Sequence, residues 1–195
     1  MAKGTGKGTR IGLDMLHYAI ITTAADGTET YGTPKALKDV RTATVSPETN
    51  TESLYADDRL VEVATSLGGI ELELEVRDIP TEDYAALTGA TIDANGVVVD
   101  KSTDNAPFVA VGWRSRKTNG AYRHYWLYKG KFGLPEDEFA TKEDSASFQT
   151  PKITGTFMPR EDGQWRAKVD SDGTDVPVGI ISSWFTKVYD GTPVV

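Results

Sequence analysis

The 195-residue chain contains no cysteine, only two histidines and no long apolar run. Without cysteine it can form no disulfide, thiolate nucleophile or cysteine-based metal site, a composition that fits a reducing compartment. No stretch approaches the roughly 20 apolar residues of a membrane-spanning helix, and the Gly- and Lys-rich residues 1–10 lack the apolar core of a signal peptide. We therefore expect a soluble protein that is synthesised in the cytoplasm and has no membrane partner.

Basic residues are also too few for a nucleic-acid-binding surface. The formal net charge is -8 and the isoelectric point is about 4.8, whereas binding of nucleic acid requires clustered Lys and Arg that replace counterions on phosphate. An acidic surface would repel DNA instead. Because no low-complexity linker interrupts the interior, the sequence predicts a flexible basic arm over residues 1–10 and a single domain over residues 11–195.

The clearest structural signal is an alternating stretch over residues 69–77. Apolar and charged side chains follow one another with a period of two, which is typical of a strand with one buried and one exposed face. The apolar set is Ile70, Leu72, Leu74 and Val76, and the acidic set is Glu71, Glu73 and Glu75. We expect the first set in the core and the second set at a surface.

A short helix is predicted directly after this strand, over residues 80–87. Asp78 can cap it, and Pro80 suits a first turn, where a missing N–H costs nothing. Gly89 is a natural stop. Two to three turns are marginal in isolation, so the helix should form only by packing against the sheet.

Tight-turn signals divide much of the remaining chain into hairpins. Asp26-Gly27 follows a strand over residues 15–23, and residues 28–32 can pair back onto it. Asn95-Gly96 and Asn119-Gly120 predict two-residue turns. The expected pairs are Ile92 with Val99, Val111 with Tyr128, Trp113 with Trp126, and Ser115 with His124.

Further strands are predicted over residues 152–158, 165–169 and 180–189, the second as a partner of the first and the third anchored in the core by Trp184. Residues 46–66 and 134–147 are polar, and we predict them to be long loops that are functional or disordered. The chain is therefore expected to be mainly β, a β-sandwich or barrel with one short flanking helix and long loops.

No catalytic centre is indicated. His17 and His124 are far apart in the sequence, and neither has a recognisable partner, so we interpret both as packing or surface residues. No serine lies in a G-x-S-x-G context. The acidic pairs Asp57-Asp58 and Glu136-Asp137 fall in polar stretches, where we expect solvated charges rather than a general acid and base.

Two weaker binding signals have ordinary alternatives. The residues Asp170, Asp172, Gly173 and Asp175 resemble part of a calcium loop but lack its final glutamate, and an Asp-Gly turn is the better interpretation. The aromatic residues Tyr122, Trp113 and Trp126 could form a sugar platform, although aromatic residues in hairpins more often pack inward. We therefore predict no enzyme, no catalytic residue, no cofactor and no metal site.

Several phrases of the sequence resemble those of one family. They are YGTP at residues 31–34, TESLYADD at 51–58, YKGKF at 128–132, FQTP at 148–151 and ITGTF at 153–157. In this order they are similar to the major tail protein, or tail tube protein, of long-tailed phages that infect Gram-positive bacteria. They carry no catalytic meaning.

The resemblance implies a tail-tube-type β-sandwich that assembles into hexameric rings. Stacked rings would form the DNA conduit of a long non-contractile tail, so the protein would be located in the virion. Its expected partners are further copies of itself, a tape measure protein, and tail terminator or tip proteins, while DNA would pass without specific binding. An acidic chain suits such a conduit because it repels DNA.

Two sets of site residues follow as hypotheses. The expected inter-subunit contacts are Leu54, Tyr55, Asp57, Asp58 and Leu60, which would become ordered on assembly. The expected lumen residues are Glu71, Glu73 and Glu75, for which an ordinary solvent-facing strand is the alternative. Two other functions remain open. They are a carbohydrate-binding or adhesive module at the tail tip that uses exposed aromatic residues, and a head or completion protein.

Overall fold

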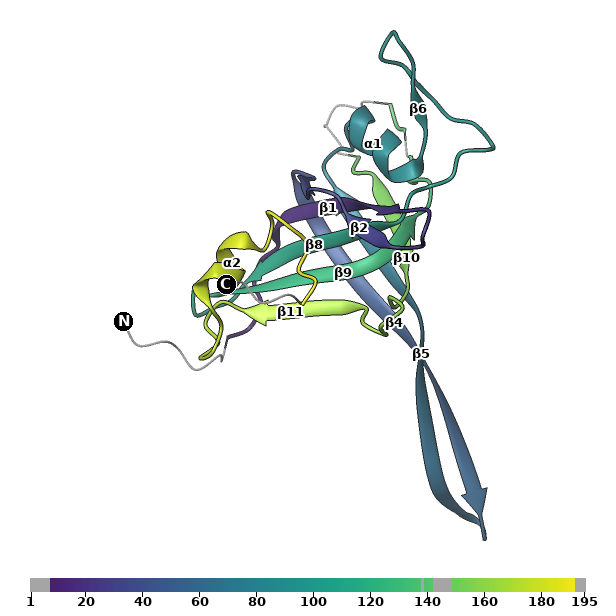
Figure 1. Cartoon of the computed structure of the whole chain (residues 1–195), viewed down its shortest axis with the longest axis vertical. Coiled ribbons are helices and arrows are strands. Elements are labelled where there is room, and N and C mark those ends of the chain that lie inside the picture. The colour runs from purple at the N-terminus through teal and green to yellow at the C-terminus, as the bar shows by residue number, and fades with distance from the viewer. Residues whose placement is uncertain (1–7, 138, 142–148, 192–195) are drawn as a thin grey trace.

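A computed structural model of the chain describes residues 8–137, 139–141 and 149–191. Its main feature is one nine-stranded sheet with the strand order β2-β1-β8-β9-β10-β5-β4, to which β11 is added beside β9 and β3 beside β1 (Figure 1). Every pairing in this sheet is antiparallel. The prediction of a mainly β protein with a short flanking helix is confirmed.

The elements are bounded as follows. The strands are β1 (Asp14–Thr23), β2 (Glu29–Tyr31), β3 (Lys35–Ala36), β4 (Val40–Ala56), β5 (Arg59–Val76), β6 (Thr91–Ile92), β7 (Val98–Val99), β8 (Val109–Arg116), β9 (Tyr122–Phe132), β10 (Lys152–Phe157) and β11 (Arg166–Asp170), and the helices are α1 (Thr81–Thr88) and α2 (Val178–Ser183). The short strands β6 and β7 form a separate hairpin.

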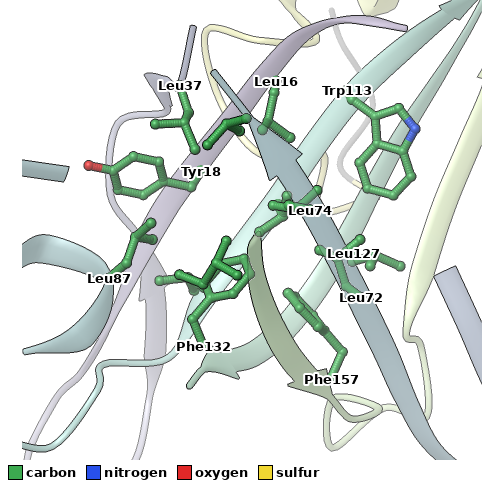
Figure 2. Packing of buried hydrophobic residues seen from close by; sticks show 14 of the residues in the cluster. Leu16, Tyr18, Leu37, Leu72, Leu74, Leu87, Trp113, Leu127, Phe132 and Phe157 are labelled. Carbon is green, nitrogen blue, oxygen red and sulfur yellow. The ribbon is translucent and has the colours of Figure 1, made fainter. Parts of the chain in front are cut away.

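The main core lies inside the curve of the sheet. Leu16 of β1 and Leu72 of β5 are separated by three strands in the sheet order, yet both belong to one buried cluster. The sheet must therefore curl over, so that its two halves face each other as the layers of a sandwich or the walls of a barrel do. Figure 2 shows Leu87 of α1 closing one side of this cluster.

The predicted alternation over residues 69–77 is confirmed in β5. Ile70, Leu72, Leu74 and Val76 are at most 1% exposed, and the acidic residues between them face outward. The helix that follows is also confirmed, and Gly89 ends it in the left-handed conformation. Its N-cap is Pro80 rather than Asp78, and no side chain caps it. Instead Asp83 holds it in place by accepting 2.7 Å contacts from Tyr18 Oη and Lys35 Nζ.

The predicted hairpins form, but two of them have a different register. Val111 pairs with Leu127 and Trp113 with Tyr125, one position from the predicted partners. The turn contains three residues, because Lys117 N donates to Ala121 O and only Gly120 has a positive φ. This is a type I turn followed by a glycine bulge, and the additional residue shifts the register by one.

The same correction applies to Asn95-Gly96. Ile92 pairs with Val98 rather than with Val99, because Asp93 N donates to Val97 O across an equally long turn. In the β8–β9 hairpin the Ser115 partner is Arg123 instead of His124. A shift of the register by one residue reverses which face of the sheet a side chain occupies relative to its partner strand. Trp113 therefore lies in the main core on the inner face, and Trp126 lies in the second cluster on the outer face.

The prediction of a strand over residues 180–189 is wrong. This part of the chain contains the end of the helix α2 and an irregular segment that follows it. This part of the chain covers the outer face of β1, β8 and β9, where it completes a second buried cluster with Ala19, Ala110 and Trp126. Trp184 is buried as expected, and its carbonyl accepts a 2.9 Å hydrogen bond from Trp126 Nε1. An apolar outer face has to be covered, and the C-terminal segment covers it.

Three further expectations require correction or lie partly outside the described residues. β11 pairs with β9 rather than with β10. Of the N-terminal residues 1–10, which were predicted to be flexible, Thr9 and Arg10 pair with the turn at Lys117 and Thr118. Residues 1–7 lie outside the described part of the chain. Of the predicted loop over residues 134–147, the described residues form one isolated bridge, between Glu136 and Lys152.

No helix among the described residues is long and apolar enough to cross a membrane.

Gly112 supplies a test of the shifted register. A Cβ atom at this position would lie 2.7 Å from the Trp126 ring directly opposite. We expect Gly112→Ala to lower the free energy of unfolding by about 1–3 kcal/mol through overpacking. Gly133→Ala is the control, because its Cβ would make only a 3.5 Å contact. Equal effects of the two substitutions in urea denaturation would contradict the register.

Candidate functional site

The predicted loop over residues 46–66 is instead a long hairpin that projects from the body. β4 and β5 continue well past the other strands and form a two-stranded ribbon, residues 48–67, which we call the arm (Figure 1). Its strands extend over roughly 30 Å at about 3.3 Å per residue. Every residue of the arm is exposed.

The tip of the arm explains why the sequence did not indicate a hairpin. Asp57 and Asp58 form its two-residue turn with φ angles of 51° and 57°. Two consecutive positive φ angles are characteristic of a type I′ turn, in which Asn-Gly is the usual signal and Asp is tolerated. The prediction of a loop was therefore wrong at this position.

The two faces of the arm differ in chemistry. Ser53 pairs with Val63 and Thr49 with Leu67, and directly opposed residues share a face. Tyr55 lies two residues beyond Ser53 and pairs with Leu60. This apolar face therefore contains Tyr55, Leu60, Val63 and Leu67 together with the hydroxyl groups of Thr49, Thr51, Ser53 and Thr65.

The opposite face is polar and acidic. Glu52 pairs with Ala64, and Leu54 pairs with Glu62. Along β4, Thr49 follows Pro47 by two residues and Pro47 pairs with Ile70, so the apolar face of the arm continues the inner face of the sheet. On β5 the register shifts by one residue between Ile70 and Leu67, and this irregularity brings Leu67 to the same face. The acidic face correspondingly continues the outer face that carries the β5 glutamates.

The apolar face has nothing to pack against within the described chain. Tyr55 is 67% exposed, Leu60 51% and Val63 50%. Full burial of one such side chain stabilises by roughly 1.5–3 kcal/mol, and an isolated two-stranded hairpin is at best marginally stable in water. The arm thus presents a surface whose burial would stabilise a complex.

The structure separates the predicted inter-subunit residues into three groups. Tyr55 and Leu60 form a cross-strand pair on the apolar face, Leu54 lies on the opposite face, and Asp57 and Asp58 form the tip. Two members of the apolar face, Val63 and Leu67, were missed by the sequence analysis. Their position on this face follows only from the β4–β5 register, which the sequence does not reveal.

The three β5 glutamates share the outer face but differ in their contacts. Glu75 is held by Arg41 at 2.6 Å and accepts a hydrogen bond from Thr150, which lowers its pKa, with the Thr150 hydrogen bond as the largest cause. Glu73 lies 3.7 Å from Lys152. For Glu71 no ion pair is found among the described residues, and it is exposed.

The Asp170–Asp175 stretch is not arranged as a calcium loop. Lys117 is 1% exposed, and its Nζ lies 2.9 Å from both Asp170 and Asp172. Arg123 binds Asp170 with both guanidinium arms and lowers the pKa of this carboxyl to about 2. These carboxylates neutralise a buried lysine and join β11 to the β8–β9 turn.

This cluster predicts a specific loss of stability in acid. Because the pKa of Asp170 is lowered from its ordinary 3.8 to about 2, its contribution is present above pH 4 and disappears as the pH falls through 2. Asp170→Asn should therefore cost about 2 kcal/mol of unfolding free energy at pH 6. The difference from the wild type should vanish near pH 2, and a difference independent of pH would contradict the assignment.

The two histidines are packing residues. His17 stacks on Phe185 with ring centroids 4.6 Å apart. His124 is 3% exposed and lies beside Trp184 and Phe185, and burial lowers its pKa to about 4. Neither histidine contacts a serine or a carboxylate in the manner of a catalytic pair among the interactions of the described residues.

The aromatic residues proposed as a sugar platform are not available as a surface. Trp126 is fully buried and Trp113 is 6% exposed, on opposite faces of the sheet. Tyr122 is partly covered by the Arg114 guanidinium, 4.1 Å above its ring. Within the described ranges, no group of three or more His, Asp or Glu side chains could hold a metal ion.

Comparison with known proteins adds no relative: no protein-family model matches the chain, and no curated protein matches it significantly.

Proposed function

We propose that the protein is a structural virion protein, a tail tube protein whose copies assemble into stacked hexameric rings. The observation that carries this proposal is the arm, a projecting ribbon with one apolar face that the described chain does not cover. The face continues the inner surface of the sheet, so it is held in one orientation by the folded body. On this proposal, the surface that covers the apolar face of the arm belongs to a second copy of the chain.

Heterologous contacts generate rings and filaments, since a surface on one copy binds a different surface on the next. The arm suits such a contact because it extends beyond its own body and carries its apolar residues on one side. On this proposal its partners are further copies, a tape measure protein within the tube, and terminator or tip proteins at the ends. Assembly of this kind requires no cofactor and no catalytic residue.

The acidic outer face of β5 supports a second part of the proposal, that Glu71, Glu73 and Glu75 line the lumen. The chain has a net charge of -8 and would therefore repel DNA. A conduit has to let DNA slide without binding it, and carboxylates provide this property. The lumen would then be lined by β5 and its neighbours.

The arm is tested by Tyr55→Ala. Because Tyr55 is exposed, we expect the variant to remain folded, with unchanged circular dichroism and melting temperature. Removal of a buried aromatic anchor from an interface should weaken self-association by at least about tenfold, or 1.4 kcal/mol. Sedimentation velocity over a concentration series measures this change.

Val178→Ala is the matched control, because Val178 is 82% exposed and lies on α2, away from the arm. It should associate like the wild type. Self-association of the Tyr55→Ala protein at wild-type strength would contradict the role of the arm.

The lumen assignment is tested by the Glu71→Lys, Glu73→Lys double variant. Both positions face outward, so folding and assembly should be retained. Assembled particles should acquire salt-sensitive DNA binding through the new lysines, since neutralised phosphates release counterions. The measurement is DNA retention in a gel-shift assay, with the Glu136→Lys, Asp137→Lys double variant as the control of equal charge, because both residues are exposed and lie outside β5. Equal DNA binding by control and variant would argue against the assignment.

A further inference from the structure

A cleft of about 840 Å³ lies beside β2, away from the arm. Its walls are formed by the β1–β2 turn, the length of β2, the turn at residues 160–162 and the segment of residues 186–190. None of these elements belongs to the arm or to the acidic outer face of β5. The cleft therefore requires an explanation of its own.

One wall of the cleft is a free sheet edge. β2 is the terminal strand of the sheet and pairs only with β1 among the described strands. Gly32 N donates to Ile20 O, and Ala24 N donates to Thr28 O. In an antiparallel pair the bonded positions alternate, so Glu29 and Tyr31 direct their main-chain N–H and C=O groups away from β1. These groups can bind an added strand.

The cleft is also predominantly acidic. It is lined by the carboxylates Asp26, Glu29, Glu161, Asp162 and Asp190 and by the cations Arg160 and Lys187. Glu29 is paired with Lys129 and Asp162 with Arg160. The guanidinium of Arg160 also lies 5.0 Å from the centroid of the Tyr128 ring, so this cation is engaged within the wall of the cleft. The fitting ligand is an extended, cationic peptide segment.

We infer that the cleft binds the N-terminal segment of a second copy, as a strand added to β2. Residues 1–10 carry Lys3, Lys7 and Arg10 and no carboxylate, in a chain with a net charge of -8. Four of these ten residues are small glycines or alanine near the lysines, which can approach a neighbouring backbone closely. The inference rests on the proposed self-assembly, to which it adds a second contact between copies.

The segment cannot lie along the cleft of its own molecule. Arg10 pairs with Lys117, at the end of the sheet where β1 begins, whereas the cleft flanks the 24–28 turn where β1 ends. The ten residues of β1 alone extend over roughly 33 Å. Residues 1–7, fully extended, span at most about 25 Å. They therefore fall short of running along their own β2, and the occupant comes from another copy.

The test is zero-length carbodiimide cross-linking of the assembled wild-type protein, mixed from ¹⁴N- and ¹⁵N-labelled batches. The reagent joins lysine amines only to carboxylates in direct contact. Mass spectrometry should find Lys3 or Lys7 linked to Asp26 or Glu161 in peptide pairs of mixed isotope. The yield should fall in high salt, because exposed attractions are screened there.

The Asp26→Lys, Glu161→Lys double variant removes these two acceptors, so its readout is the total yield of mixed-isotope links from Lys3 and Lys7 to any carboxylate of the cleft. This yield should fall by about tenfold, because the two new lysines repel the cationic segment. Asp137→Lys, at an exposed position outside the cleft, should leave it unchanged. Lys3 and Lys7 linked only to other carboxylates, or only within one isotope, would overturn the inference. If the protein assembles and this link is missing, only the inference fails. If no mixed-isotope link of any kind forms, the proposed self-assembly fails with it.

Discussion

A two-stranded ribbon cannot bury its own side chains, and this constraint governs the interpretation of the molecule. In the arm, each strand has one neighbour and each face has no covering layer, so Tyr55, Leu60 and Val63 remain exposed. Exposed apolar groups at the end of a long projection do not stabilise the monomer. They acquire a purpose when another surface covers them, which is why the arm rather than any cavity is the candidate functional site.

The body supplies what the arm lacks. β5 runs from the arm into the core, where its buried residues between Ile70 and Val76 share one cluster with residues of α1 and of five other strands, namely β1, β4, β8, β9 and β10. The same strand thus has its apolar side in the core along one half and uncovered along the other. Rigid anchoring of one half orients the other, so association would not have to order the whole ribbon.

The sequence predicts best those segments whose side chains are buried within the same chain. The alternation in β5 and the helix α1 were predicted correctly because the core imposes their patterns. The arm was not, because neither of its faces packs on the body and its turn is Asp57-Asp58 rather than Asn-Gly. Residues 180–189 were assigned to a strand because a short apolar run does not distinguish strand from helix. Tyr55 and Leu60 were predicted from the sequence to be contact residues, whereas the placement of Val63 and Leu67 on the same face required the register.

Electron microscopy of the purified protein over a concentration series tests the central claim most directly. The account predicts rings, and at higher concentration tubes, with a central channel and with subunits joined through their arms. Isolated particles at every concentration, with the arm still exposed to solvent, would contradict it.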